Sequence, residues 1–296
     1  FIISLSPLLW FRGTSLLSED FNLPKNREMM EQYLYTWNST INLGFAPYDN
    51  IQAILFFWFQ SLVTDLGFSL QITQTIIFVF WVLAPGLSFY YFLHSILPKS
   101  IFKFGGLPGS VFYMTATSLI PIWQGFNIAN LSGYAYGPIL LAIFINMVDG
   151  KLSFPRAAAA FGIWSFLGSS IGVNTPFLLI FSIPFVLYPL CRVIVLIKEN
   201  NSQKAFNIFN KSLCFAFIFV FTNAFWLLPL INSLVGVTSE EVSPFSQKVA
   251  SNWLDGISTR TSLLNVMRLQ GIWTWENGFG LDLYDPYSVK YLENYF

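Results

Sequence analysis

Two adjacent carboxylates, Glu19 and Asp20, are the side chains of this sequence best placed to carry out chemistry. They follow an apolar run at residues 1–11 and precede a segment with a helical pattern, so they fall at a boundary between lipid and water. A carboxylate in that place can take a proton from the hydroxyl group of a lipid-borne substrate. The alternative is that both are solvated loop residues and that Asp20 only extends the capping turn of the next helix.

The residue types that hold metals and prosthetic groups are scarce. His94 is the single histidine, and the only cysteines, Cys191 and Cys214, sit in or near apolar segments, which favours lipid-facing or packing thiols. Glu19 and Asp20 alone make a poor divalent-cation site. We therefore predict no bound metal and no resident cofactor, and leave open whether a divalent cation assists the reaction.

The composition identifies the solvent of these residues as a bilayer. Hydrophobic residues make up 54% of the chain and charged residues 10%, against about 25% charged in an average soluble domain. The formal net charge is zero and no long basic run occurs, which excludes the electrostatic footprint of a nucleic-acid-binding protein. The sequence predicts an all-α, polytopic membrane protein.

Long stretches without Asp, Glu, Lys or Arg contain the predicted membrane spans. Turn residues at 124–133 and 168–175 divide the two longest stretches. The predicted spans are residues 70–97, 106–122, 134–148, 157–171, 176–197 and 212–235. Several contain proline, which membrane helices tolerate where neighbouring groups satisfy the freed backbone, so we expect a bundle that lines a cavity.

Basic residues give the predicted orientation. They are concentrated in three connections that we expect to be short loops: Lys99 and Lys103, Lys151 and Arg156, and Arg192 to Lys211 with Lys198 and Lys204 between them. The positive-inside rule assigns such loops to the cytoplasm. All but two of the 15 acidic residues then lie outside, and the spans themselves are predicted to carry no charge at membrane depth.

The first outer region, residues 13–69, contains two predicted surface helices. Asn22 can cap a helix whose apolar positions Met30, Tyr33, Leu34 and Trp37 share one face. Residues 51–63 form an apolar stretch too short to span a bilayer, which we expect to be interfacial or re-entrant.

This first loop carries a resemblance to a known family. The stretch from Ser18 to Pro24, the Leu34-Tyr35-Thr36-Trp37-Asn38 sequence and the following Asn42-Leu43-Gly44 resemble the first outer loop of GT-C fold membrane glycosyltransferases, most of all the alpha-(1→3)-arabinofuranosyltransferase type. Looser similarities cover nearly the whole chain, at 172–174, 225–230 and 261–273. The resemblance implies a GT-C-like helical bundle in a prokaryotic cytoplasmic membrane with its active site on the extracytoplasmic face.

The resemblance also implies a mechanism. Asp20 matches the acidic residue that acts as general base, with Glu19 in reserve, and the donor would be a polyprenyl-phosphate sugar, a pentofuranose among the candidates. The acceptor would be an envelope glycan or lipid, and the anomeric configuration would invert. Asn38 stands where many relatives carry Asp, so no acid–base role is assigned to it.

Outer residues further along the chain are candidates for binding the donor. Arg260 and Arg268 could contact the lipid phosphate, Asn174 the sugar hydroxyl groups, and Trp273 a sugar face. Each has an alternative: the arginines as surface residues and Asn174 as a helix cap. Tyr136 and Trp226 are assigned to the interfacial aromatic belt.

We expect residues 1–236 to form the transmembrane domain and 237–296 the start of an extracytoplasmic region, with the sequence truncated at both ends. Two other functions remain open. A transporter or lipid flippase would also show broken helices around a cavity, and a scaffold subunit would keep the fold without the base.

Overall fold

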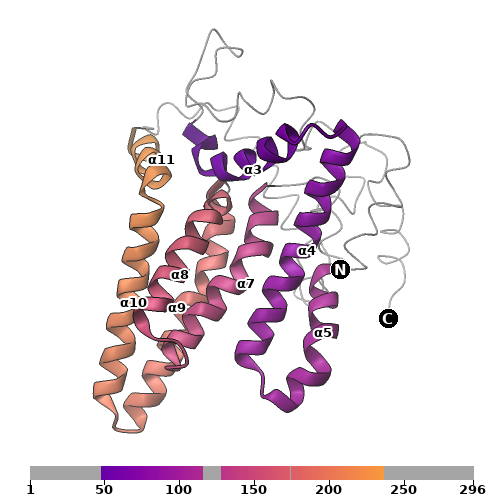
Figure 1. Ribbon diagram of the computed structural model, residues 1–296. Helices are drawn as coiled ribbons and strands as arrows, with labels where there is room; N and C mark the ends of the chain where they lie inside the picture. The colour runs from indigo at the N-terminus through magenta and orange to yellow at the C-terminus, as the bar shows by residue number, and fades with distance from the viewer. Residues whose placement is uncertain (1–47, 116–127, 174, 237–296) are drawn as a thin grey trace, which may run out of the picture. The chain divides into compact units, whose positions relative to one another are not determined.

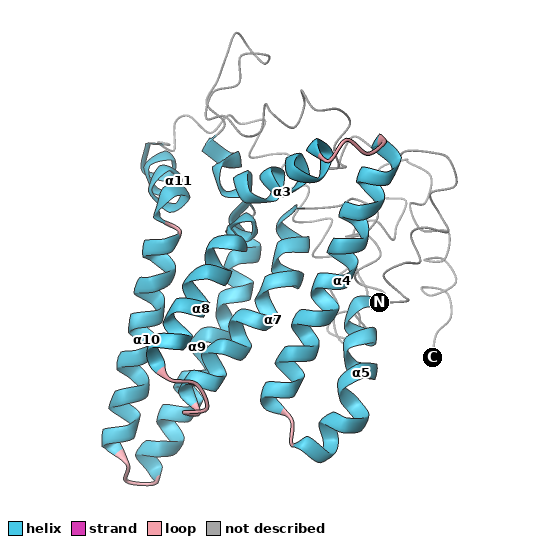
Figure 2. Cartoon of the chain, viewed as in Figure 1, coloured by secondary structure: helices cyan, strands magenta, loops and turns pink. Residues whose placement is uncertain are grey.

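The computed structural model describes residues 48–115, 128–173 and 175–236, and throughout these ranges the chain forms helices and no β-strand (Figure 2). Described residues 48–114 and 128–231 belong to one compact unit. The helices, in chain order, are η2 (Tyr48–Ala53), α3 (Ile54–Asp65), α4 (Leu70–Ile96), α5 (Lys99–Thr115), α7 (Ile128–Val148), α8 (Phe154–Leu167), η4 (Ser169–Val173), α9 (Thr175–Lys198), α10 (Ser202–Thr222) and α11 (Ala224–Gly236).

Four of the described helices are long and apolar enough to cross a membrane: α4, α7, α9 from Leu178 onward, and α10. Large apolar side chains such as Leu187, Phe206 and Phe217 are exposed on α9 and α10. Such a surface favours lipid over water because its side chains are apolar, and a helix can lie in lipid because its backbone groups are satisfied within it. The chain is therefore an all-α, multi-pass membrane protein, as the sequence predicts.

Two predicted spans are confirmed, and the predicted short apolar helix is present, while its interfacial or re-entrant location stays a prediction. Helices α4 and α9 match the predicted spans 70–97 and 176–197 to within one residue at each end. The short apolar stretch that begins at Ile51 forms η2 and α3, which are too short to span. Figure 1 shows α3 lying across the bundle axis at its upper end, where Phe56 stacks on Trp81 of α4 with ring centroids 5.0 Å apart.

Other predicted boundaries are wrong. Helix α7 begins at Ile128, not at residue 134, because Asn130 and Gly133 are interior helix residues and not part of a turn. Helix α5 begins at Lys99, not at residue 106. The predicted span 157–171 is instead α8 of 14 residues followed by η4, which is shorter than the ~20 residues that cross a hydrocarbon core.

The predicted span 212–235 is two helices. Helix α10 begins at Ser202, where Asn201 caps it by accepting a hydrogen bond from the backbone amide of Lys204 at 3.4 Å. It ends at Thr222, and α11 starts after Asn223. Lys204 and Lys211 are thus helix residues, and the loop between α9 and α10 is only residues 199–201.

Helix α7 is the centre of the unit. It packs on α4 over most of its length and also contacts α8, α9 and η4. More than half of its most apolar window is buried, whereas α9 and α10 are buried over less than a fifth of theirs. In Figure 1, α4 and α5 lie on one side of α7, and α8, α9 and α10 on the other.

The neighbours of α7 satisfy the backbone groups that Pro138 frees. Proline has no N–H, so the carbonyl of Tyr134, four residues earlier, loses its usual helical partner. The hydroxyl of Tyr113 on α5 donates to that carbonyl at 3.3 Å. The amide of Ile139 donates to the Ser88 hydroxyl of α4 at 3.0 Å. The predicted tolerance of membrane helices for proline is confirmed here in atomic detail.

Every Lys and Arg of the described residues lies within about three helical turns of the connections at 97–98, 149–153 and 199–201, which all lie at one end of the unit (Figure 1). We call this the basic end. Asp149 lies there between Lys151 and Arg192, with both ion-pair distances at 3.6 Å, and accepts a hydrogen bond from Tyr188 at 2.9 Å. Arg192, Lys204 and Lys211 belong to α9 and α10 and lie toward the basic end. The absence of charge at membrane depth stays a prediction.

The opposite end of the unit is held by polar and aromatic contacts. The Ser169 hydroxyl of η4 donates to the backbone carbonyl of Gln52 in η2 at 2.8 Å. Trp226 of α11 is 1% exposed, donates its indole N–H to Asn223 at 2.9 Å, and packs so closely on Gly172 that a Cβ there would overlap the indole. Trp226 is thus an interior residue, and its assignment to the interfacial belt is wrong.

Candidate functional site

The six residues predicted to act on substrate lie outside the described residues: Glu19, Asp20, Asn174, Arg260, Arg268 and Trp273. Their roles remain predictions. The described residues contribute a different feature, a cavity on the side of α7 that faces α8, α9 and α10.

The cavity has a volume of about 490 Å³, within the ~300–1,000 Å³ of small-molecule sites. Along α7 it extends from Ser132 to Phe144, which corresponds to roughly 18 Å at the α-helical rise. Ser132 and Ile171 lie toward the end opposite the basic end, and Val193 and Phe209 toward the basic end. The cavity is therefore a slot that runs along the bundle.

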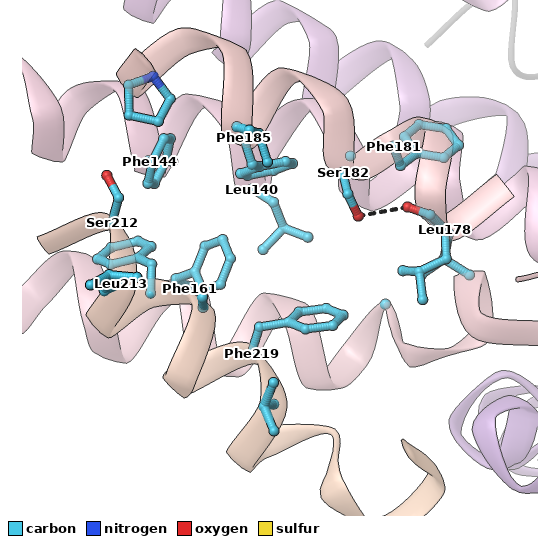
Figure 3. Close-up of a pocket in the computed structure, with 18 of the residues that line it drawn as sticks. Leu140, Phe144, Phe161, Leu178, Phe181, Ser182, Phe185, Ser212, Leu213 and Phe219 are labelled. Carbon is cyan, nitrogen blue, oxygen red and sulfur yellow. Dashed lines mark hydrogen bonds between the residues drawn. The ribbon is translucent and has the colours of Figure 1, made fainter. Parts of the chain in front are cut away.

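Hydrocarbon forms nearly all of the wall. Figure 3 shows the rings of Phe144, Phe161, Phe185 and Phe219 around the space. Toward the basic end Phe161 and Phe215 pack with centroids 4.7 Å apart, and Phe144 lies 5.5 Å from Phe215. No lining residue carries a formal charge, so water gains few hydrogen bonds there, and an apolar chain is the favoured occupant.

The slot is accessible from the side of the bundle that faces lipid. Val186 of α9 is 62% exposed and Val220 of α10 is 54% exposed, and both line the cavity. Leu190, Phe209 and Leu213, which also line it, are exposed as well. A hydrocarbon chain in the bilayer can therefore enter between α9 and α10 without crossing water.

Two glycines of α7 shape one wall. Gly133 and Gly137 face Phe181 of α9, and a Cβ added at Gly137 would lie 3.0 Å from its ring, while one at Gly133 would overlap it. The ring of Phe181 thus rests in a notch, which lets α9 approach α7 closely. The sequence does hold a signal for this packing, because two glycines four residues apart in an apolar helix indicate a helix–helix contact.

Tyr136 belongs to the cavity wall, not to the interfacial belt to which the sequence assigns it. Its ring centroid lies 6.2 Å from that of Trp81 and 6.0 Å from that of Trp164. A Cβ at Gly168, at the end of α8, would lie 2.8 Å from the Tyr136 Cβ. Tyr136 therefore fixes the spacing of α4, α7 and α8 beside the slot.

Three serines are the small polar residues of the lining. Ser182 and Ser212 each donate to the carbonyl four residues earlier on their own helix, Leu178 at 2.7 Å and Ile208 at 2.9 Å (Figure 3 shows the first). Ser132, which is 1% exposed, has no hydrogen-bond partner. Buried side chains of Gln60, Thr73 and Trp81 also hold polar atoms without a partner.

Within the described ranges, no three His, Cys, Asp or Glu side chains come together. Cys191 and Cys214 are free thiols exposed on α9 and α10, which fits the lipid-facing alternative of the prediction better than the packing one. The described part of the chain thus offers an apolar slot, whose lining includes the buried Ser132 hydroxyl without a partner.

No family model, curated protein or solved structure matches this chain at the level that would establish a relationship.

Proposed function

We propose that this protein is a membrane glycosyltransferase of the GT-C type that moves a sugar from a polyprenyl-phosphate donor to an envelope glycan or lipid. The observation that supports the proposal best is the apolar slot of about 490 Å³ that opens toward lipid. An enzyme whose donor stays in the bilayer needs such a place for the hydrocarbon part of that donor. The carboxylate pair in the first loop supplies the chemistry that the slot lacks.

The orientation follows from the charges. The positive-inside rule assigns the basic end to the cytoplasm, so the opposite end, with Ser132 and the connection before α4, faces outward. The loop that holds Asp20 is predicted on that same side. We therefore place the transfer reaction at the extracytoplasmic face of a prokaryotic cytoplasmic membrane.

The reaction needs one base and one leaving group. Asp20 takes the proton from an acceptor hydroxyl as its oxygen forms a bond to the anomeric carbon of the sugar. The bond between that carbon and the phosphate oxygen breaks, polyprenyl phosphate leaves with the electron pair, and the configuration inverts. Glu19 is the reserve base. Arg260 and Arg268 balance the phosphate charge, and Asn174 and Trp273 contact the sugar.

The test is transfer of radiolabelled sugar from polyprenyl-phosphate donors to membrane acceptors, with the wild-type full-length protein and its Asp20→Asn variant at matched expression. Losing a general base typically reduces the rate ~10²–10⁴-fold. Glu199→Gln is the matched control, because Glu199 is an exposed carboxylate at the basic end. Loss of transfer in Asp20→Asn alone supports the proposal, and equal transfer by all three removes Asp20 from the mechanism.

A lipid flippase is the second candidate, and the lateral opening of the slot favours it, since a lipid in transit also needs a path between helices. Reconstituted vesicles distinguish the two. A flippase moves a labelled isoprenoid phosphate between leaflets and forms no glycoside, whereas the transferase forms a glycoside. Transbilayer movement without sugar transfer would replace the first proposal with the second.

A further inference from the structure

We propose that Ser132 is the polar end of the slot and that its hydroxyl donates a hydrogen bond to the phosphoester oxygen of an isoprenoid phosphate whose chain lies along α7. This inference rests on the proposed function, because it assumes an isoprenoid phosphate as the lipid. It assigns a binding residue for the donor within the described part of the chain.

The state of the Ser132 hydroxyl is the first argument. Hydroxyl groups in these helices commonly donate to the carbonyl four residues earlier: Thr64, Thr75, Ser95, Ser110, Ser182, Ser212 and Thr222 all do so. That local bond is the usual way to satisfy a helical Ser or Thr. Ser132 makes no such bond, although it is buried. Its donor is therefore free for a group that enters the slot.

The position of Ser132 is the second argument. It lies in the second turn of α7, toward the end opposite the basic end, and it lines the slot together with Tyr136 one turn further on. In the proposed orientation this is the outer-leaflet side, where the head group of the donor must lie. The apolar lining then extends from Ser132 toward the membrane interior, in the direction that the chain of the lipid would take.

Trp81 of α4 holds another buried donor at the level of Ser132, but it lies outside the lining of the slot. The pairs Ser88–Ile139 and Ser95–Asn146 both join α4 and α7 across 51 positions in the sequence. The same interval places Trp81 opposite Ser132, and the Trp81 ring lies 6.2 Å from that of Tyr136. The Trp81 indole N–H is buried without a partner. Because Trp81 does not line the slot, its N–H is not assigned to the lipid.

The chemistry of the slot favours an isoprenoid phosphate over a phospholipid. The slot is a single space of about 490 Å³, which suits one chain, whereas a phospholipid brings two chains on one glycerol. In an isoprenoid phosphate the acceptor oxygen is bonded directly to the chain, so it can reach a hydroxyl at the end of the slot. An apolar surrounding makes that hydrogen bond stronger than it would be in water.

The experiment measures binding of radiolabelled farnesyl phosphate to the purified full-length protein in nanodiscs. We expect Ser132→Ala to weaken this binding by about tenfold, the loss expected for a hydrogen bond to a charged group. Ser110→Ala is the matched control, because it removes a buried helical hydroxyl that donates within its own helix and lies outside the lining of the slot. Its binding should stay within about twofold of wild type.

A thermal unfolding measurement separates binding from folding. Because the Ser132 hydroxyl has no partner in the ligand-free protein, Ser132→Ala should not lower the unfolding temperature without ligand, but it should reduce the increase that farnesyl phosphate produces. A purely structural serine would behave in the opposite way. Competition with dioleoylphosphatidylglycerol tests the lipid class, and we expect it to displace farnesyl phosphate poorly.

Three results would overturn the inference: no binding of farnesyl phosphate, equal binding by wild type and Ser132→Ala, or full displacement by equimolar phosphatidylglycerol. The proposed function has a separate test in sugar transfer. Binding that depends on Ser132 without any transfer would refute the enzyme and leave the binding site standing. Transfer with unchanged binding in Ser132→Ala would do the reverse.

Discussion

The amide nitrogen of Ile139 lies 3.0 Å from the hydroxyl oxygen of Ser88, a hydrogen bond between α7 and α4 at the point where Pro138 interrupts the helical pattern. Ser88 is buried, so no water replaces it if it is removed. The bond therefore stabilises both the pairing of the two helices and the proline-containing turn.

Ser88→Ala should lower the free energy of unfolding by about 1–2 kcal/mol, because it leaves the Ile139 amide unpaired in a buried place. Unfolding by sodium dodecyl sulfate in mixed micelles measures the change. Ser110→Ala is the control: its hydroxyl is also buried but donates only to Gly106 of its own helix. An equal loss in both variants would show that the contact between helices contributes nothing specific.

Gly133→Ala should destabilise the protein by about 1–3 kcal/mol, since the added methyl group overlaps the ring of Phe181. Combining Gly133→Ala with Phe181→Ala should cost less than the sum of the two single changes, because the smaller side chain makes room. The same unfolding assay, applied to the wild type, the two single variants and the double variant, completes this double-mutant cycle.

Gly105→Ala is the control for the glycine substitution. No atom lies within 4 Å of its added Cβ, and replacing a helical glycine is favourable by ~0.5–1 kcal/mol. If the losses in the free energy of unfolding caused by Gly133→Ala and Phe181→Ala simply add in the double variant, the Phe181 ring does not pack against Gly133 as described.

Asp149→Asn should have a small effect that depends on salt. Its partners Lys151 and Arg192 have side chains 54% and 46% exposed, and ion pairs with such partners contribute roughly 0–1 kcal/mol. The loss should be measurable at low ionic strength and should shrink at 1 M salt, where the Debye length falls to ~3 Å. A large loss at high salt would mean that the Tyr188 hydrogen bond, not the charge, holds this end together.

Labelling of single cysteines should confirm the orientation. Leu66→Cys and Glu199→Cys place exposed thiols at opposite ends of the unit, in a background with Cys191 and Cys214 replaced by Ser. In intact cells a membrane-impermeant maleimide should label position 66 and reach position 199 only after permeabilisation. The reverse pattern would invert the orientation and place the slot's Ser132 end at the cytoplasm.

The sequence predicts the fold well where apolar residues alone define a helix. Helices α4 and α9 are long apolar runs, and their ends fall where the prediction places them. The predicted start of the next span, residue 212, is later than the observed start of α10 at Ser202. The prediction assigns Lys204 and Lys211 to the preceding loop. Long basic side chains can extend toward the membrane surface from within a helix, so lysines do not mark its end.

The start of α7 was missed for a related reason. Asn130, Ser132 and Gly133 are turn-forming residues in water, but inside a membrane bundle small and polar residues lie at helix contacts. The sequence predicts a cavity in the bundle but not its place or its lining, because these depend on how Phe181 of α9 packs on glycines of α7 more than 40 positions away. The predicted catalytic and sugar-binding residues lie outside the described residues, so their geometry remains a prediction.

The interval of 51 positions between α4 and α7 also limits how the protein can move. Contacts that repeat every seven residues on both helices are the spacing of a left-handed supercoiled pair, and sliding by one repeat would shift α7 by roughly 10 Å along its axis. A shift of α7 in the direction that moves Asp149 into the hydrocarbon core would bury its charge. We therefore expect α4 and α7 to keep their relative position. The hairpin of α9 and α10 is buried over less than a fifth of its most apolar windows, so it is the least restrained wall of the slot.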